Sequence, residues 1–384
     1  MAKGDREILS WSVSRRRPRA ASLGTALVLI VALAGCGDAN ETATPTTTAT
    51  DGAATPAPRP GLPGIVELVA GNGSDDSAGR PGPAADASLG SDPTFAVAPN
   101  GDAFVISPAP VVLLVHDGQI EEIYTGAAGE FAFGGVAVGP DGDAYVTMST
   151  GVRRIGADGS SEQVLDAAAE GLLLSHLGPI AFDDAGRFYF WNSTTAQVLR
   201  RDPDGSLTPV AGTGTQGPAG QPPAGDGGPA TEAPLSVIDQ LAVDGEGNLL
   251  IADSGQAVVR SVAPDGTIST IAGGGDTPMG GTVRTFVDDG TAATALRLGQ
   301  VTGVAVDGNG RVYVADGSNH LIFRFEPGGG IELVIGDQAD VVEEMGHAAF
   351  DTRATNVSNL VIDGEGNLVF LDRNSIRRIR DATD

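Results

Sequence analysis

Three aspartates take the same position in successive copies of a repeated sequence pattern. Asp253, Asp316 and Asp372 each end the second apolar run of their copy. Carboxylates brought together from consecutive copies could bind one ligand, or Ca²⁺, a hard cation that favours oxygen donors. Alternatively, each aspartate caps its own loop by accepting hydrogen bonds from backbone N–H groups, as in Asx-turns.

Polar residues follow each of these aspartates in a short loop. If the copies fold alike, these loops lie on one face of the protein, where they can contact the same ligand. The expected ligand contacts are Asp253, Ser254, Gln256, Asp316, Ser318, Asn319, Asp372, Arg373 and Asn374.

The histidines offer a second kind of chemistry. Catalytic zinc sites use three protein ligands, and histidine is prominent among them. His176, His320 and His347 fall in segments expected on the face just described, whereas His116 precedes a tight turn expected on the opposite face. The first three histidines therefore define an alternative function, that of a metal-dependent lyase or hydrolase.

The repeated pattern is an apolar run, a glycine-containing turn, a second apolar run and a polar loop. The second glycine of each turn recurs six times at spacings of 41 to 63 residues, at Gly101, Gly142, Gly186, Gly247, Gly310 and Gly366. A third apolar run, a turn resembling Pro264-Asp265-Gly266 and a fourth run complete each copy. Four short runs rich in Val and Ile, joined by tight turns, predict one four-stranded antiparallel blade of a β-propeller.

The sixth copy ends at Asp384 without a fourth strand. Residues 64–71, Gly-Ile-Val-Glu-Leu-Val-Ala-Gly, resemble the fourth strands of other copies, such as Thr267 to Gly273. An N-terminal strand that completes the last blade closes the ring without an unprotected edge. We therefore expect an all-β fold in which residues 64–384 form one closed, six-bladed propeller.

The residues before this domain have the layout of a bacterial lipoprotein export signal. Basic residues around Arg15 precede an apolar segment that is too short for a membrane span, and Leu33-Ala34-Gly35-Cys36 resembles the site at which a lipoprotein is cleaved and acylated. We expect a signal peptide at 1–35, lipidation of Cys36, and a Thr-, Pro- and Ala-rich flexible tether at 36–63. The alternatives are a plain secretory signal and, for the export route, twin-arginine transport in place of general secretion.

The charge of the chain excludes two classes of partner. With 23 basic and 49 acidic residues, the net charge is −26. Such a charge repels phosphate backbones and anionic lipid headgroups, so we expect no nucleic acid binding and no membrane contact except through the lipid anchor. Lys3 is the only lysine and lies in the expected signal, which excludes Schiff-base catalysis by the remainder of the chain.

The sequence resembles the NHL-repeat family of β-propellers. The most specific stretch combines Val210 to Gly214, Gly225 to Leu235, Leu241 to Asp244 and Ile251 to Asp253. The resemblance extends over nearly all of residues 64–384 and is strongest in the fourth and fifth copies. It implies a propeller whose ligand-binding loops surround the central channel on one face.

These observations together predict a non-enzymatic binding module on the extracytoplasmic face of the cell membrane. We expect a lipid-anchored monomer that binds an envelope protein or a glycan and needs no cofactor. Calcium at the aspartates and zinc at the histidines stay open, as does an envelope scaffold without a discrete site.

Overall fold

The computed structural model describes residues 66–74, 76, 78–107, 111–127, 130–172, 177–278, 290–336 and 355–380, without the side chains of residues 132, 133 and 177. The chain divides into two units, Met1–Thr55 and Pro56–Asp384, and every described residue belongs to the second. Cys36, the expected signal and the expected tether lie outside the described residues. In the described part, no helix has the length and apolar character needed to cross a bilayer.

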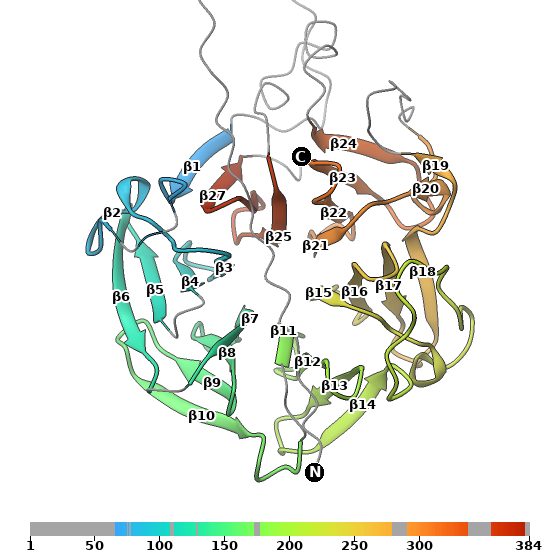
Figure 1. The fold of residues 1–384 in the computed structure, drawn as a ribbon, viewed down its shortest axis with the longest axis horizontal. Helices are drawn as coiled ribbons and strands as arrows, with labels where there is room; N and C mark the ends of the chain where they lie inside the picture. Colours follow the sequence, from blue (N-terminus) through green and yellow to red (C-terminus); the bar gives the residue numbers. More distant parts are fainter. Residues whose placement is uncertain are drawn as a thin grey trace, which may run out of the picture. The chain divides into compact units, whose positions relative to one another are not determined.

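The described strands form six sheets arranged around a central axis, each a blade of the expected propeller (Figure 1). Blade 1 contains β3 (Thr94–Val97), β4 (Ala103–Ser107), β5 (Val111–His116) and β6 (Gln119–Thr125), with β2 (Gly82–Pro83) at its outer edge. Blade 2 contains β7 (Ala132–Val138), β8 (Ala144–Met148), β9 (Gly151–Ile155) and β10 (Ser161–Asp166). Blade 3 contains β11 (Leu177–Phe182), β12 (Phe188–Asn192), β13 (Gln197–Arg201) and β14 (Leu207–Ala211).

The second half of the ring follows the same plan. Blade 4 contains β15 (Ile238–Val243), β16 (Leu249–Asp253), β17 (Val258–Val262) and β18 (Ile268–Gly273). Blade 5 contains β21 (Val301–Val306), β22 (Val312–Asp316), β23 (Leu321–Phe325) and β24 (Ile331–Ile335). Blade 6 contains β25 (Val357–Ile362), β26 (Leu368–Asp372), β27 (Ser375–Ile379) and β1 (Val66–Ala70).

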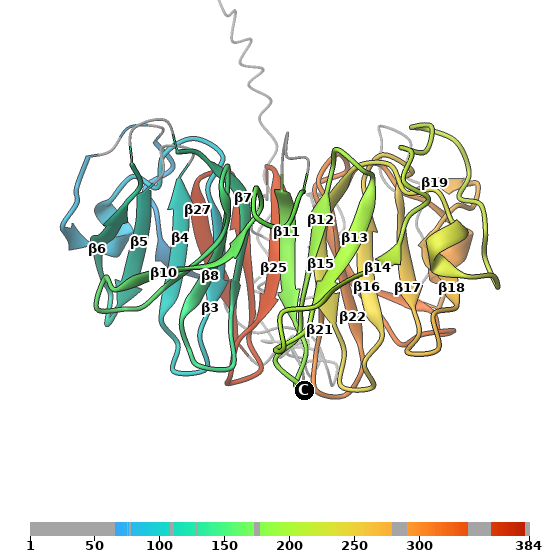
Figure 2. The same ribbon diagram turned by 90° about the horizontal axis from the view of Figure 1, so that it is seen from below.

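Short elements connect the blades. Three 3₁₀ turns, η1 (Ala84–Asp86), η2 (Ala230–Glu232) and η3 (Ala293–Ala295), each follow a loop that lies after a fourth strand. The pair β19 (Thr277–Pro278) and β20 (Leu296–Arg297) forms a small parallel sheet after blade 4. In the side view, the blade strands run between two ends at which the loops gather (Figure 2). We call the end with the loops between second and third strands the top face.

The N-terminal strand closes the ring, as the sequence predicts. β1 pairs antiparallel with β27, so strands from both ends of the described chain share the sixth blade. Ala70 of β1 packs in the hydrophobic cluster that also holds Leu371 of blade 6 and Phe95 of blade 1. Just beyond β1, Gly71 has φ of +94°, and a Cβ there would lie 2.3 Å from the carbonyl oxygen of Asn374. Glycine is therefore required where the closing strand meets the last top-face loop.

The hydrophobic core is divided among the blade interfaces. Leu250 and Val259 of blade 4, for example, pack in one cluster with Val314 and Phe323 of blade 5. Each fully buried side chain of this kind contributes roughly 2 kcal/mol by leaving water. A propeller can therefore be stable although only 5% of its residues are aromatic, because every interface between blades is a small core of its own.

Gln240 connects three blades at the channel. The first strand of each blade presents an unpaired edge to the centre of the ring, and Gln240 of β15 reaches across it. Its side-chain amide nitrogen donates to the carbonyl of Leu360 (2.6 Å), and its oxygen accepts from the backbone N–H groups of Val304 (3.0 Å) and Leu360 (2.9 Å). Blade 4 is thereby bonded to blades 5 and 6 through one buried side chain.

We expect Gln240→Leu to lower the free energy of unfolding by about 3 kcal/mol, because three backbone groups lose a buried partner. Denaturant unfolding of the purified protein measures the change. Gln119→Leu, at an exposed glutamine of β6, is the matched control and should shift stability by no more than about 0.5 kcal/mol. Equal effects of the two substitutions would contradict the bridging role of Gln240.

Candidate functional site

A cavity of 490 Å³ opens on the top face beside the channel. First strands of blades 1, 4, 5 and 6 contribute to its wall, together with the loop between β26 and β27. Its polar lining residues are Asp92, Thr94, Asp239, Thr302, Asn356, Ser358, Asn359, Arg373 and Asn374. Asp239 and Asn359 also line a cavity of 290 Å³ that follows all six first strands down the channel.

Three β-bulges supply residues to this cavity. In β15 the pairing shifts between Ile238 and Gln240, and equivalent shifts occur near the start of β21 and β25. The residues that the pairing skips are Asp239, Thr302 and Asn359, and all three line the cavity. A bulge redirects a side chain out of the regular alternation of a strand. This explains how β15, whose other side chains are mostly buried, can present the carboxylate of Asp239 to the cavity.

Left-handed backbone conformations concentrate around the same cavity. Among the described residues, seven other than glycine have positive φ, and Asp92 (47°), Asn359 (48°) and Arg373 (54°) are cavity-lining members of that group. Such conformations cost of order 1 kcal/mol each and are found preferentially at functional sites. Part of the cavity lining thus has a backbone geometry that the rest of the fold must stabilise.

Asp239 is the electrostatically unusual member of the site. Burial raises its pKa to about 6, and the neighbouring charge of Asp253 acts in the same direction. Hydrogen bonding to the side chains of Ser254 and Gln300 opposes this rise. The carboxylate is therefore ionised at neutral pH although the surroundings disfavour its charge.

Arg373 and Asp92 bring exposed charges to the cavity. Arg373 lies in the two-residue turn between β26 and β27, where its backbone N–H donates to the carbonyl of Asn356 (3.1 Å). No described residue forms an ion pair with the side chain of either Arg373 or Asp92. The nearby carboxylate of Asp372 is instead paired with Arg377 (3.2 Å). Two charges of opposite sign thus face the same space without neutralising each other.

The structure places the three repeat aspartates inside their own loops. Asp253 is buried and accepts hydrogen bonds from the backbone N–H groups of Ser236 (2.9 Å) and Gln256 (3.0 Å). Asp316 accepts from Gly299 (2.7 Å) and Asn319 (3.1 Å) in the equivalent arrangement. Both carboxylates, whose pKa burial raises, make the bonds expected of the loop-capping alternative.

Asp372 follows the same plan, accepting from the backbone N–H of Thr355 (2.8 Å). The other expected contacts fall into two groups. Arg373 and Asn374 line the cavity. The side chain of Ser254 is hydrogen-bonded to Asp239, which also lines the cavity. Gln256, Ser318 and Asn319 belong to the capped loops of blades 4 and 5. Direct ligand contact by any of the expected residues remains a prediction.

Of the three candidate zinc ligands, His320 alone is described. It is half-buried in the top-face loop of blade 5 with φ of 56°, and its Nδ1 atom is buried with no hydrogen-bond partner among the described residues. His176 and His347 lie outside the described residues. Within the described ranges, no group of three or more His, Cys, Asp or Glu side chains is arranged to hold a metal ion.

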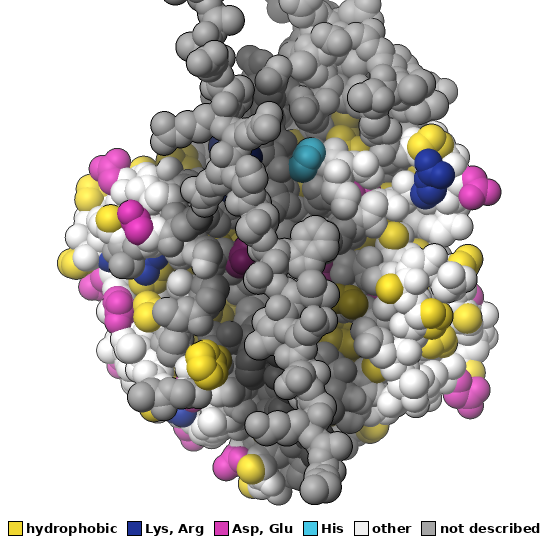
Figure 3. Space-filling view, in the orientation of Figure 1, with side chains coloured by type: hydrophobic (Ala, Val, Ile, Leu, Met, Phe, Trp, Pro, Cys, Tyr) yellow, Lys and Arg dark blue, Asp and Glu magenta, His cyan; other side chains and the backbone are white. Residues whose placement is uncertain are grey.

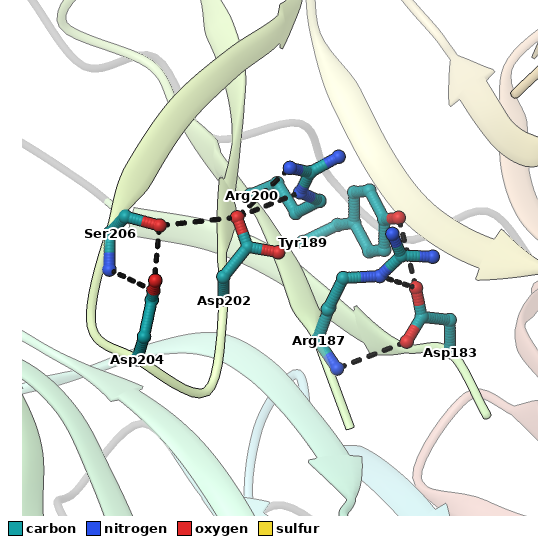
Figure 4. A network of polar contacts seen from close by, with 7 residues as sticks. All are labelled: Asp183, Arg187, Tyr189, Arg200, Asp202, Asp204 and Ser206. Atoms are coloured by element: carbon teal, nitrogen blue, oxygen red, sulfur yellow. Dashed lines mark hydrogen bonds and ion pairs between the residues drawn. The ribbon is translucent and has the colours of Figure 1, made fainter. Parts of the chain in front are cut away.

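A second cavity, of 500 Å³, lies between blades 3 and 4 near the opposite face and is lined by Tyr189 and Arg200 among others. Figure 4 shows that their polar groups are already engaged: the Tyr189 hydroxyl donates to Asp183 (3.0 Å), and Arg200 pairs with Asp202 (2.9 Å). Because these bonds lie within blade 3, this cavity offers a ligand fewer available charges than the top-face cavity.

The top of the ring also exposes apolar side chains. Phe131 (56% exposed) directly precedes β7, and Val237 (44%) directly precedes β15, so both lie where a first strand enters from the top face. In the space-filling view along the axis, acidic side chains are visible on the outer flanks and beside the centre (Figure 3). The described surface therefore mixes isolated apolar groups with negative charge.

The comparisons with known proteins agree with this architecture. The model of the Teneurin NHL domain matches residues 125–284, and that of the NHL repeat matches residues 298–325. The chain is an NHL-repeat β-propeller. No curated protein sequence matches this NHL-repeat propeller.

Solved structures share the fold at low sequence identity. A Bacteroides thetaiotaomicron protein of unknown function is 20% identical with a TM-score of 0.59, covering 82% of this chain and 75% of that one. An auxiliary nutrient binding protein from Bacteroides ovatus is 14% identical (TM-score 0.58; 82% and 76% covered). A gluconolactonase from Xanthomonas campestris is 15% identical (TM-score 0.51; 84% and 97% covered). These likenesses show a shared fold and leave the ligand open.

Sequence reasoning missed Asp92, Asp239 and Asn359. A partial signal existed for Asp239, because an ionisable residue interrupts the apolar run Ile238-Asp239-Gln240-Leu241-Ala242-Val243. The strand alternation alone does not reveal whether such a residue faces the channel, a neighbouring blade or a bulge. Only the pairing of β15 with β16 decides it.

We expect Asp239→Asn to stabilise the protein at pH 7 by about 2 kcal/mol. The folded-state pKa, about 6, lies above the unfolded value, so ionisation of Asp239 costs stability as the pH rises from about 4 to about 6. Asparagine removes that cost above pH 6 and gives little gain at about pH 3, where both states of the wild type are largely protonated. Denaturant unfolding across this pH range measures the difference. Asp184→Asn, at an exposed aspartate of the β11–β12 turn, is the control, and a gain independent of pH would contradict the assignment.

Proposed function

We propose that this NHL-repeat propeller is a binding module on the extracytoplasmic face of the cell membrane. Its ligand, an envelope protein or glycan, occupies the top-face cavity around Asp239 and Arg373. The acylated Cys36 provides the only contact with the membrane, and residues 36–63 act as the tether. The module works as a monomer without a resident cofactor.

The cavity itself carries this proposal. Its volume of 490 Å³ falls within the usual range of ligand pockets, about 300–1,000 Å³. It combines a partly buried carboxylate of raised pKa with an exposed guanidinium and several amide side chains. An ionised carboxylate that is partly buried and left-handed backbone within a concave surface are costly for folding, and such costs are typical of binding sites.

The relatives by fold agree with a binding role without identifying the ligand. The Bacteroides ovatus protein is described as an auxiliary nutrient binding protein, so a similar fold occurs in a protein with a binding role. A metal-dependent lyase or hydrolase built on His176, His320 and His347, with Zn²⁺ as its metal, is the alternative, and Ca²⁺ at the repeat aspartates is a separate possibility. The described residues hold no metal-binding cluster that favours it.

Filling the cavity should abolish binding. We expect Ser358→Arg, at a cavity-lining residue of β25, to weaken binding of the full chain to purified cell-wall glycan or to solubilised envelope proteins by at least about tenfold, because a large side chain occupies the ligand's place. Pull-down with immobilised protein measures it, and circular dichroism verifies folding. Ser269→Arg, on the exposed surface of β18, is the matched control. Equal binding by both variants would refute the cavity as the ligand site.

The membrane anchor has a separate test. We expect Cys36→Ser to move the protein from the membrane pellet to the soluble fraction, since no other residue can carry the thioether-linked lipid. Metabolic labelling with an alkyne-bearing fatty acid should mark the wild type and not the variant. Thr47→Ala in the tether is the control and should remain in the pellet with its label. A soluble, unlabelled wild type would favour the plain secretory signal.

A further inference from the structure

We infer that the part of the ligand held in the top-face cavity is zwitterionic: an amino-acid or short-peptide portion of the envelope component, whose amine meets Asp239 and whose carboxylate meets Arg373. This inference rests on the proposed function, which makes that cavity the ligand site. It adds the chemical class of the ligand.

The guanidinium of Arg373 is placed to receive an acid. Its loop is fixed by the backbone hydrogen bond to Asn356 and by the left-handed turn, while its side chain is exposed at the cavity. Asp372, the adjacent carboxylate in sequence, is occupied by Arg377 and by the N–H of Thr355. A planar guanidinium with unused donors matches a carboxylate in shape and charge.

Asp239, which blade 4 contributes to the same cavity, can receive an amine. Asp239 projects from a bulge and is ionised above pH 6, yet no described arginine forms an ion pair with it. Asp92 adds a second carboxylate to the lining, also without an ion-pair partner among the described residues. The net charge of −26 further favours the approach of a ligand that carries an ammonium group.

Ligands of other charge types fit this lining less well. A neutral sugar would leave a partly buried carboxylate and a guanidinium desolvated without partners, which is unfavourable. A simple acid would satisfy Arg373 and be repelled by the two aspartates. A simple amine would satisfy the aspartates and leave the guanidinium unpaired. A molecule with both charges can pair with the carboxylate of Asp239 and with the guanidinium of Arg373 at the same time.

Three dipeptide probes separate these cases: Ala-Ala, its N-acetyl form without the amine, and its C-terminal amide without the carboxylate. We expect isothermal titration of the purified full chain at pH 7.5 to show Ala-Ala binding at least about tenfold more tightly than either blocked form. Arg373→Gln should remove the preference over the amide, and Asp239→Asn the preference over the acetylated form. Arg297→Gln and Asp184→Asn, at exposed residues away from the cavity, are the matched controls and should keep both preferences.

The outcomes distinguish the two levels of the proposal. Blocked probes that bind as well as Ala-Ala, or preferences that survive both cavity substitutions, would overturn the zwitterionic class. Absence of binding by all three probes, while Ser358→Arg still abolishes envelope binding, would overturn the class and leave the cavity as the ligand site. Envelope binding that is insensitive to Ser358→Arg refutes the proposed function itself.

Discussion

The unpaired edges of six first strands are the constraint around which this propeller is organised. A strand edge presents backbone N–H and C=O groups that need partners, and here six such edges face one narrow channel. Side chains at the top of the channel satisfy several of them across blade boundaries. Gln240 links blade 4 to blades 5 and 6, Asn359 accepts from the backbone of Phe95 in blade 1 (3.2 Å), and Thr302 donates to Val357 in blade 6 (2.7 Å).

The closing strand solves the same problem at the outer edge of the last blade. β1 pairs with β27, and Glu67 forms ion pairs with Arg378 (3.2 Å) and Arg380 (2.9 Å), residues at the other end of the chain. These exposed pairs contribute little by themselves. The backbone pairing of β1 with β27 and the hydrophobic cluster shared with blade 1 contribute more to closing the ring. Through them every blade has two neighbours.

The candidate site lies where the side-chain bonds between first strands come close to the closing strand. Asn359 and Thr302 bond neighbouring blades and also line the cavity, and Gly71 of the closing segment packs against the carbonyl of Asn374. The residues that hold the ring together on this side thus also shape the top-face cavity. Asp239 is the exception, since its burial as an ionised group opposes folding. A group retained against stability is more readily explained by binding than by architecture.

The sequence by itself determined the number of blades, the strand order within each and the source of the closing strand, because these depend on local turn chemistry and a repeated apolar pattern. It also predicted ligand contacts at Arg373 and Asn374, two residues that the structure places in the cavity lining. Only the tertiary structure decided that Asp253, Asp316 and Asp372 turn inward to cap their loops, and that bulges direct Asp239, Thr302 and Asn359 into one cavity. The reason is physical: a bulge depends on how a strand pairs with its partner and fits between two blades, and those contacts join residues distant in the chain.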